Sequence, residues 1–247
     1  MIVQAACVCR QPFIIRRRVS PDAEGTFDPG VILIESESEV RNRFTIHADR
    51  RKRTCIQEEM HMSESVYLME VIKELERNAH LVREEELQAA ADLILASDRI
   101  FVAGAGRSGF AARGFSNRLM HLGRTVYFVS EPTTPSIGKG DLLWIASGSG
   151  QTGSMRVMAE TAKGLGAALA TVTIHPEGAI GQMADTVIRL PGGTPKSSLE
   201  DTCPSIQIMA DAFEQMSWIV YDVLIHELME RTGVTEEEMF SRHANLE

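Results

Sequence analysis

Five short apolar runs alternate with helix-like segments between residues 100 and 190, and this alternation constrains the fold more than any other feature of the sequence. Each run has a strand's length and is bounded by glycine or polar residues. Strands that alternate with helices form parallel sheets covered on both faces. We therefore predict an α/β fold with a flavodoxin-like five-stranded parallel sheet, in the order 2-1-3-4-5. The predicted strands are 100–103, 126–129, 141–145, 167–174 and 186–190.

Helical patterns precede, separate and follow the predicted strands. Before the first strand, Leu68, Ile72, Leu75 and Ala79 recur with helical spacing, which predicts a helix with one apolar side. The acidic and basic residues of the same segment, Glu70, Lys73 and Glu74, are placed on the opposite side. The other predicted helices are 84–96, 110–122, 155–164, 178–183, 206–231 and a short one near Met239, which the capping-box pair Thr235 and Glu238 starts.

Residues 1–59 differ from the rest of the chain. They contain ten Lys/Arg and nine Asp/Glu, and we find no periodicity that would bury their few apolar clusters together. We expect residues 1–59 to be an atypical, poorly ordered extension and residues 60–247 to be a single domain. Met60 and Met62 just before the first clear helix also raise the hypothesis of a mis-assigned upstream start. A basic arm and a metal site at Cys7, Cys9 and Cys55 are the less favoured alternatives.

Charge and hydropathy narrow the class of partner. The formal net charge of −9 argues against binding to nucleic acid, so a small molecule is the expected partner. The four cysteines form no disulfide framework, and no apolar run approaches the ~18 residues of a membrane span. Residues 1–9 lack the basic start of a signal peptide. We expect a cytoplasmic protein that makes no use of a membrane.

A polar loop follows the third predicted strand and leads into a helix. Its seven residues, 146–152, include two glycines, Gly148 and Gly150, and three hydroxyl side chains, Ser147, Ser149 and Thr152. At a helix amino terminus, unpaired N–H groups and the helix dipole favour an anion. The loop therefore predicts a phosphate site. The alternative is a tight turn in which Thr152 merely caps its helix.

A second glycine-rich loop follows the first predicted strand. The glycines of the segment 104–109 match the dinucleotide fingerprint, and Glu131 lies near the position expected for a ribose ligand. An NAD-binding Rossmann protein is therefore one hypothesis. In the predicted strand order, however, both loops flank one crevice, where Ser108 and the loop 146–152 converge on a single compact phosphate. A small phosphorylated metabolite explains both loops, whereas a dinucleotide explains only the first.

Several motifs together resemble the 6-phospho-3-hexuloisomerases of the sugar isomerase (SIS) domain family, over about residues 62–247. The matching segments are Gly104–Gly109, Arg118–Gly123, Thr134–Pro135, Ser147–Thr152, Phe213–Gln215 and Arg242–Leu246. The resemblance implies interconversion of D-arabino-3-hexulose 6-phosphate and fructose 6-phosphate through a 2,3-enediol, in the ribulose monophosphate route that fixes or detoxifies formaldehyde. It implies no redox cofactor and no metal.

The resemblance also assigns roles to residues. Glu214 matches the family's base, and partial burial among Phe213, Met216 and Trp218 would raise its pKa and improve it as a base. His243 is the second catalytic candidate, because an imidazole can pass protons between the enediol oxygens near neutral pH. His121 and His226 are weaker alternatives, favoured as surface or packing residues. The predicted substrate-binding residues are Arg107, Ser108, Ser147, Gly148, Ser149, Thr152 and Thr134.

Two further expectations concern assembly and class. The apolar helices near 68–79 and 206–228 are consistent with subunit packing, and the resemblance implies a tetramer whose C-terminal tail reaches a neighbouring active site. The resemblance also leaves a second class open, because SIS domains serve as non-catalytic sugar-phosphate sensors in regulators. The presence of both Glu214 and His243 favours the enzyme. The sequence leaves the choice among related sugar phosphates open, with Thr133–Pro135 expected to contact the rest of the sugar.

Overall fold

The computed structural model describes residues 13–15, 34–36, 65–195 and 203–246. Its contacts divide the chain into two units, Met1–Ser63 and Glu64–Glu247. In the first unit, β1 (Phe13–Ile15) pairs antiparallel with β2 (Ile34–Ser36). The remaining expectations for residues 1–59, including a metal site at the three cysteines, lie outside the described residues.

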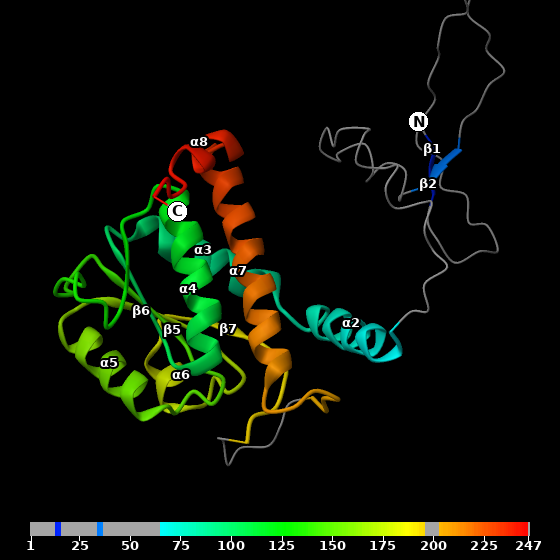
Figure 1. The fold of residues 1–247 in the computed structure, drawn as a ribbon, viewed down its shortest axis with the longest axis horizontal. Helices are drawn as coiled ribbons and strands as arrows, with labels where there is room; N and C mark the ends of the chain where they lie inside the picture. The colour runs from blue at the N-terminus through cyan, green and yellow to red at the C-terminus, as the bar shows by residue number, and fades with distance from the viewer. Residues whose placement is uncertain (1–12, 16–33, 37–64, 196–202, 247) are drawn as a thin grey trace, which may run out of the picture. The chain divides into compact units, whose positions relative to one another are not determined.

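The second unit is built on the predicted parallel sheet (Figure 1). Its strands lie in the order β4-β3-β5-β6-β7, and every neighbouring pair is parallel. Numbered along the chain from β3, this is the order 2-1-3-4-5, so the predicted topology is confirmed. The strands are β3 (Ile100–Gly104), β4 (Val126–Phe128), β5 (Leu142–Ala146), β6 (Ala168–Thr173) and β7 (Thr186–Arg189).

Helices cover both faces of this sheet and bury two separate apolar clusters. The larger cluster joins the sheet to α3 (Glu84–Ala96), α4 (Gly106–His121) and α7 (Asp211–Thr232). The smaller cluster joins the other face to α5 (Gly153–Gly164) and α6 (Ala179–Met183). Because β5 is buried along its whole length, it lies at the centre of the unit.

The helices α4 and α7 lie side by side, and both begin near the carboxyl edge of the sheet (Figure 1). Aromatic residues fill their contact: Phe115 stacks on Tyr221 with ring centroids 4.6 Å apart and lies 5.0 Å from Trp144 of β5. A Cβ atom at Gly114 would come within 2.7 Å of the Trp218 ring, so the missing side chain permits this close approach. The packing therefore fixes the two helix amino termini beside each other.

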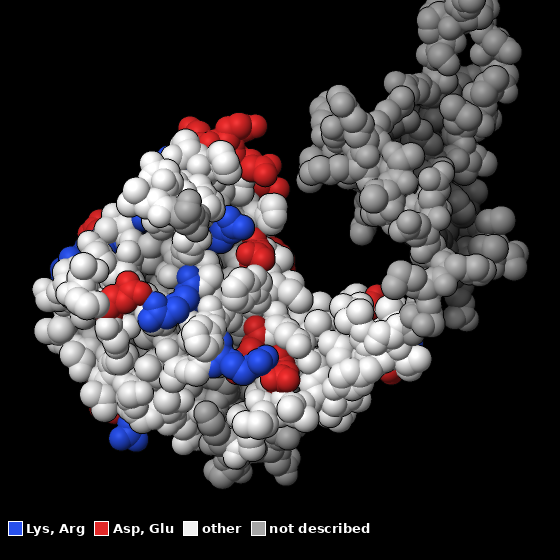
Figure 2. Space-filling view, viewed as in Figure 1, with Lys and Arg blue, Asp and Glu red and all other residues white. Residues whose placement is uncertain are grey.

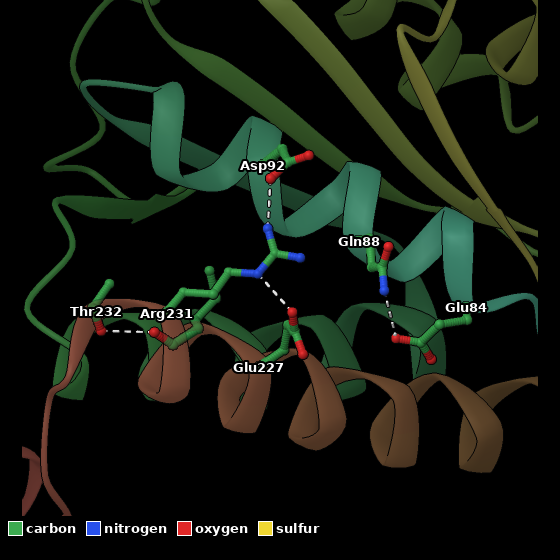
Figure 3. A network of polar contacts seen from close by, with 7 residues as sticks. Glu84, Gln88, Asp92, Glu227, Arg231 and Thr232 are labelled. Atoms are coloured by element: carbon green, nitrogen blue, oxygen red, sulfur yellow. Dashed lines mark hydrogen bonds and ion pairs between the residues drawn. The ribbon is translucent and has the colours of Figure 1, made fainter.

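A polar network attaches the carboxyl-terminal half of α7 to α3 (Figure 3). Arg231 donates to Glu227 at 2.6 Å on its own helix and pairs with Asp92 of α3. Exposed ion pairs of this kind contribute about 0–1 kcal/mol, so the network orients α7 more than it stabilises it. The last helix, α8 (Glu236–Ser241), begins with the predicted capping box of Thr235 and Glu238.

The first helix of this unit, α2 (Val66–Ala79), buries a charged residue of the side opposite the predicted apolar stripe. The side chain of Glu74 is buried and accepts hydrogen bonds from Ser205 Oγ at 2.6 Å and the Ile206 backbone N–H at 3.1 Å. Leu68 and Ile72 are instead 57% and 48% exposed. The reason is that a distant segment supplies donors for a carboxylate, which the helical period of the sequence does not show.

Two helix boundaries also differ from the predicted ones. The helix α4 begins at Gly106, four residues before the predicted start, so Arg107 and Ser108 lie in its first turn instead of in a loop. The helix α7 begins at Asp211 instead of residue 206. Met209 and Ala210 have φ angles of 52° and 71°, and this left-handed backbone cannot continue a right-handed helix.

Candidate active site

A cavity of about 560 Å³ opens at the carboxyl edge of the sheet, where β3 and β5 lie side by side. The chain leaves β3 toward β4 on one side and leaves β5 toward β6 on the other, so this is the topological switch point of the sheet. The cavity is lined by the start of α4, the loop after β5 and the start of α7. The predicted residues that line it are Arg107, Ser108, Ser147, Gly148, Ser149, Thr152 and Glu214.

The loop after β5 forms one wall, and its hydroxyl groups lie close together. Ser147 Oγ and Thr152 Oγ1 are 3.1 Å apart, and Ser149 Oγ accepts a hydrogen bond from the Gln151 N–H at 3.3 Å. Ser147 and Ser149 are buried within the chain. The loop therefore presents several short polar side chains in one small space, as a site for a phosphate group requires.

Hydrogen bonds from β6 hold this loop in place from behind. The carbonyl of Gly148 accepts from the Ile174 N–H at 3.1 Å and from Thr173 Oγ1 at 3.2 Å. Gly150 has a φ of 62°, and a Cβ atom there would lie 2.8 Å from the carbonyl oxygen of His175. Only glycine meets both conditions without strain, so the loop is held by its backbone.

Two helix amino termini face the cavity without a side-chain cap. Thr152 is the N-cap residue of α5, but its side chain makes no capping hydrogen bond and pairs with Ser147 instead. The alternative in which the Thr152 hydroxyl serves mainly as a helix cap is therefore not what the structure shows. Ala105, the N-cap of α4, has no side-chain acceptor to offer. The first N–H groups of both helices are thus left for an anion.

The glycines of the first loop serve close packing. A Cβ atom on Gly104 would come within 2.9 Å of the Gly109 Cα atom, so the strand and the helix meet backbone to backbone. The predicted ribose ligand of the dinucleotide alternative, Glu131, pairs with Arg113 of α4 at 2.5 Å. In this structure the loop brings the start of α4 to the cavity, and the carboxylate of Glu131 has a protein partner.

The opposite wall of the cavity carries charged side chains. Arg107 donates from Nε to the carboxylate of Glu214, and its Nη2 atom lies 3.1 Å from Asp211 Oδ1. The hydrogen bond to Glu214 and the charges of both carboxylates raise the pKa of Arg107. The Glu214 side chain is 14% exposed, but Phe213 and Met216 point into the core. The immediate partner of Glu214 is therefore a guanidinium and not the apolar pocket that we predicted.

His243 lies far from Glu214 within one chain. Its ring stacks on His121, the last residue of α4, with centroids 5.1 Å apart. Because Arg107 is in the first turn of that helix and contacts Glu214, the rise along α4 separates the two predicted catalytic residues by roughly 20 Å. The predicted pair is not brought together in the single chain.

The two weaker histidine candidates, His121 and His226, lie at the same end of the second unit as His243. His121 is buried, and this burial, with Arg118 and His243 nearby, lowers its pKa. His226 is exposed and lines a cavity of about 420 Å³ together with His121 and His243. Neither His121 nor His226 lines the cavity at the switch point.

Thr134 is the one predicted substrate-binding residue that does not line the switch-point cavity. Its hydroxyl donates to the Phe128 carbonyl at 2.9 Å, and its N–H donates to the Glu131 carbonyl at 2.9 Å, so it holds the turn after β4. Asp211 and the left-handed residues Met209 and Ala210 line the cavity but escaped prediction. Asp211 stands three residues before Glu214, a spacing that places both on one helix face, whereas nothing in the sequence marked Met209.

Charges of both signs are interspersed on the visible surface. On the face drawn in Figure 2, Lys and Arg atoms lie beside Asp and Glu atoms and form no broad basic area. Among residues 13–15, 34–36, 65–195 and 203–246, no group of three or more His, Cys, Asp or Glu is placed to hold a metal ion. No helix within those ranges has the length and hydropathy needed to span a bilayer.

Several large apolar side chains are exposed on α2 and α7. Tyr67 and Leu68 of α2 are 61% and 57% exposed, and Trp218 and Val223 of α7 are 48% and 45% exposed. A single exposed apolar residue is ordinary, but neighbouring groups of this size often mark a protein contact. These surfaces are consistent with the predicted subunit packing.

Comparison with known proteins gives a consistent result. The SIS domain model matches residues 93–213. Over 186 residues the chain is 45% identical to 3-hexulose-6-phosphate isomerase of Bacillus subtilis (strain 168), which covers 75% of this chain and 100% of that protein. It is 37% identical over 161 residues to the protein of that name from Methanocaldococcus jannaschii, covering 65% and 84% of the two chains.

One solved structure extends this result to the fold. It is that of a Methanococcus jannaschii protein for which a molecular function of 3-hexulose-6-phosphate isomerase was inferred. It matches with a TM-score of 0.57 and 35% identity, covering 72% of this chain and 93% of that one. The match to the SIS domain model ends at Phe213, so it includes the loop after β5 but neither Glu214 nor His243.

Proposed function

The chain belongs to the 3-hexulose-6-phosphate isomerase family of SIS-domain proteins, and we propose that it interconverts D-arabino-3-hexulose 6-phosphate and fructose 6-phosphate at the switch-point cavity. The single observation that carries this proposal is the pairing, in one cavity, of two uncapped helix amino termini and three hydroxyl side chains with a carboxylate on the facing wall. The first set suits a phosphate, and the carboxylate suits proton transfer.

The reaction moves a carbonyl group from C3 to C2 without net oxidation. Glu214 takes the proton from C2; the electron pair of that C–H bond forms the C2=C3 double bond of the 2,3-enediol, and the π pair of the C3 carbonyl moves onto O3. The proton is then returned at C3, while the hydroxyl proton on O2 is transferred to O3. The substrate and the product therefore differ only in the positions of two hydrogen atoms and one double bond.

The residues proposed to bind the phosphate hold the sugar in place for this proton transfer. Ser147, Ser149 and Thr152 hold the phosphate oxygens, together with the N–H groups at the starts of α4 and α5. Arg107 and Ser108 contact it from the other side, and Gly148 lets the backbone approach closely. Because the phosphate stays bound while the carbon atoms react, the residues that hold it also position C2 and C3 next to Glu214.

His243 acts in this proposal from a neighbouring subunit, where it transfers the proton between O2 and O3. The roughly 20 Å between His243 and Glu214 within one chain supports a shared site. The exposed apolar surfaces of α2 and α7 support a homo-oligomer, which we propose to be a tetramer. The proposed cytoplasmic location rests on the cysteine content of the sequence, and the proposed place in the ribulose monophosphate route of formaldehyde fixation rests on the family resemblance alone.

A direct assay tests the function. We expect the wild-type protein to convert 3-hexulose 6-phosphate to fructose 6-phosphate without added metal or redox cofactor, and Glu214→Gln and His243→Ala to lose most of this activity. A wild-type protein that binds fructose 6-phosphate but converts neither sugar would instead be a sugar-phosphate sensor. Stoichiometric binding of NADH would restore the dinucleotide alternative.

A further inference from the structure

Three charged side chains meet at the mouth of the switch-point cavity. Arg107, from the first turn of α4, pairs with Glu214 and Asp211, both from the first turn of α7. The Arg107 side chain is 62% exposed, whereas those of Glu214 and Asp211 are 14% and 25% exposed. One guanidinium is thus shared by two carboxylates and faces the solvent-filled space that a ligand enters.

In this arrangement Arg107 has two competing partners, the carboxylate of Glu214 and the phosphate of the substrate. In the proposed reaction Arg107 neutralises the phosphate, but in the structure it neutralises Glu214, the proposed base. If Arg107 stayed with the carboxylates, a phosphate dianion would enter beside a cluster with a net charge of −1. If Arg107 turned to the phosphate, Glu214 would lose its counter-ion.

The relative strength of the two interactions decides between these possibilities. An ion pair with an exposed member is weak, because water screens it and the long side chain loses conformational freedom. A guanidinium binds a phosphate dianion more strongly, because two parallel hydrogen bonds and a larger charge are available. The phosphate therefore competes successfully for Arg107.

We propose that Arg107 is a latch between the base and the substrate: it neutralises Glu214 in the empty site, and the entering phosphate releases it. This inference rests on the proposed function and adds its regulation, since a carboxylate that has lost its counter-ion is the stronger base. Glu214 is thereby unpaired only when a phosphorylated sugar occupies the cavity.

The hydrogen-bonding geometry allows the latch to open without a large movement. Arg107 contacts Glu214 through Nε and Asp211 through Nη2, so it uses different nitrogen atoms for the two carboxylates. The contact to Glu214 can therefore break while Asp211 keeps the guanidinium near the cavity. Opening requires only rotations within one exposed side chain.

Competition for Arg107 can be measured by binding alone, with inorganic phosphate as the probe and isothermal titration calorimetry as the readout. The substitution Glu214→Gln removes the carboxylate that competes with phosphate for Arg107. It should tighten phosphate binding by up to about fivefold, which is the range of a partly exposed ion pair. In an Arg107→Ala background the same substitution should have little effect. Glu214→Ala provides a second test of the same competition, and circular dichroism verifies that each variant is folded.

A matched control removes a similar ion pair elsewhere on α4. Glu131 pairs with Arg113, which is also partly exposed, but neither residue lines the cavity. Glu131→Gln makes the same change in charge and should leave phosphate affinity unchanged. If Glu214→Gln tightens binding equally with and without Arg107, simple charge repulsion explains the gain and the latch is overturned. No gain in either background overturns it as well.

Failure of the latch can be told apart from failure of the function. Conversion of 3-hexulose 6-phosphate by the wild type tests the function and does not depend on the phosphate titrations. Conversion without coupling between Arg107 and Glu214 refutes the latch alone. Coupling without conversion refutes the isomerase and leaves Arg107 shared between a carboxylate and a bound phosphate.

Discussion

The two walls of the switch-point cavity are built in different ways. The loop after β5 is held by hydrogen bonds that its backbone accepts from Thr173 at the end of β6 and from the adjacent Ile174, and by a glycine that no other residue can replace without strain. The facing wall consists of long charged side chains at the starts of α4 and α7, and its proposed proton-transfer partner, His243, lies at the other end of α4. The wall proposed to bind the phosphate is thus formed within one chain, whereas the wall proposed for proton transfer lacks His243 unless a second chain supplies it.

The SIS domain match also separates the two walls, because it includes the loop after β5 and stops before Glu214. The matched residues, 93–213, contain the phosphate loop and end one residue before Glu214. A phosphate site is what an enzyme and a sensor of sugar phosphates have in common, and the acid–base residues are what an enzyme adds. We therefore expect substitutions on the two walls to affect different kinetic constants.

The largest effect should come from the proton-transfer wall. Glu214→Gln keeps the size of the side chain but removes its basicity, so we expect kcat to fall by about 10²- to 10⁴-fold, while KM falls by no more than the roughly fivefold gain expected in phosphate affinity. Steady-state kinetics with 3-hexulose 6-phosphate measures both constants. A fall in affinity without a fall in kcat would place Glu214 among the binding residues.

Removal of a hydroxyl from the phosphate wall should have a smaller effect of another kind. Ser147→Ala removes a hydrogen bond to a charged group, so we expect KM to rise by roughly 10- to 100-fold while kcat changes little. Ser147→Thr, which keeps the hydroxyl, is the matched control. Equal losses of kcat in Ser147→Ala and Glu214→Gln would remove the distinction between the two walls.

The rigidity of the loop after β5 can be tested by substituting Gly150. Gly150→Ala introduces a Cβ atom 2.8 Å from the His175 carbonyl at a φ of 62°. We expect the free energy of unfolding in urea to fall by about 1–3 kcal/mol and phosphate affinity to fall with it. Gly153→Ala is the control, since a Cβ atom there meets nothing within 4 Å. Unchanged affinity in Gly150→Ala would show that the loop adapts.

The smallest effect concerns the docking of the C-terminal tail. Burial beside Arg118 and His243 lowers the pKa of His121, so the docked tail favours neutral His121. Docking should therefore be strongest above the ordinary histidine pKa of ~6.5 and weaken as the pH falls below it. Hydrogen exchange of residues 242–246 between pH 7.5 and 5.5 measures this change, after correction for intrinsic rates. His121→Asn should reduce the pH dependence, and an unaltered dependence would contradict this role.

Much of the fold and of the phosphate wall could be predicted because their signals are local. Alternating apolar runs predicted the strands and a parallel sheet, the flavodoxin-like arrangement supplied their order, and the glycines and hydroxyls of residues 146–152 lie within one loop. The burial of Glu74 and the pairing of Arg107 with Glu214 join residues more than 100 positions apart. No sequence period reports such contacts, and the same is true of the left-handed backbone at Met209 and Ala210.

Mixing of subunits tests most directly whether the proton-transfer wall is completed by a neighbour. Glu214→Gln and His243→Ala chains, each inactive alone, are co-expressed in equal amounts with the same affinity tag, and the total population of oligomers is purified and assayed without separating the mixed ones. If each site takes Glu214 from one chain and His243 from another, random pairing should restore about one quarter of wild-type activity in the unfractionated mixture. Activity that stays at the level of the two parent variants would show that His243 does not complete a neighbour's site.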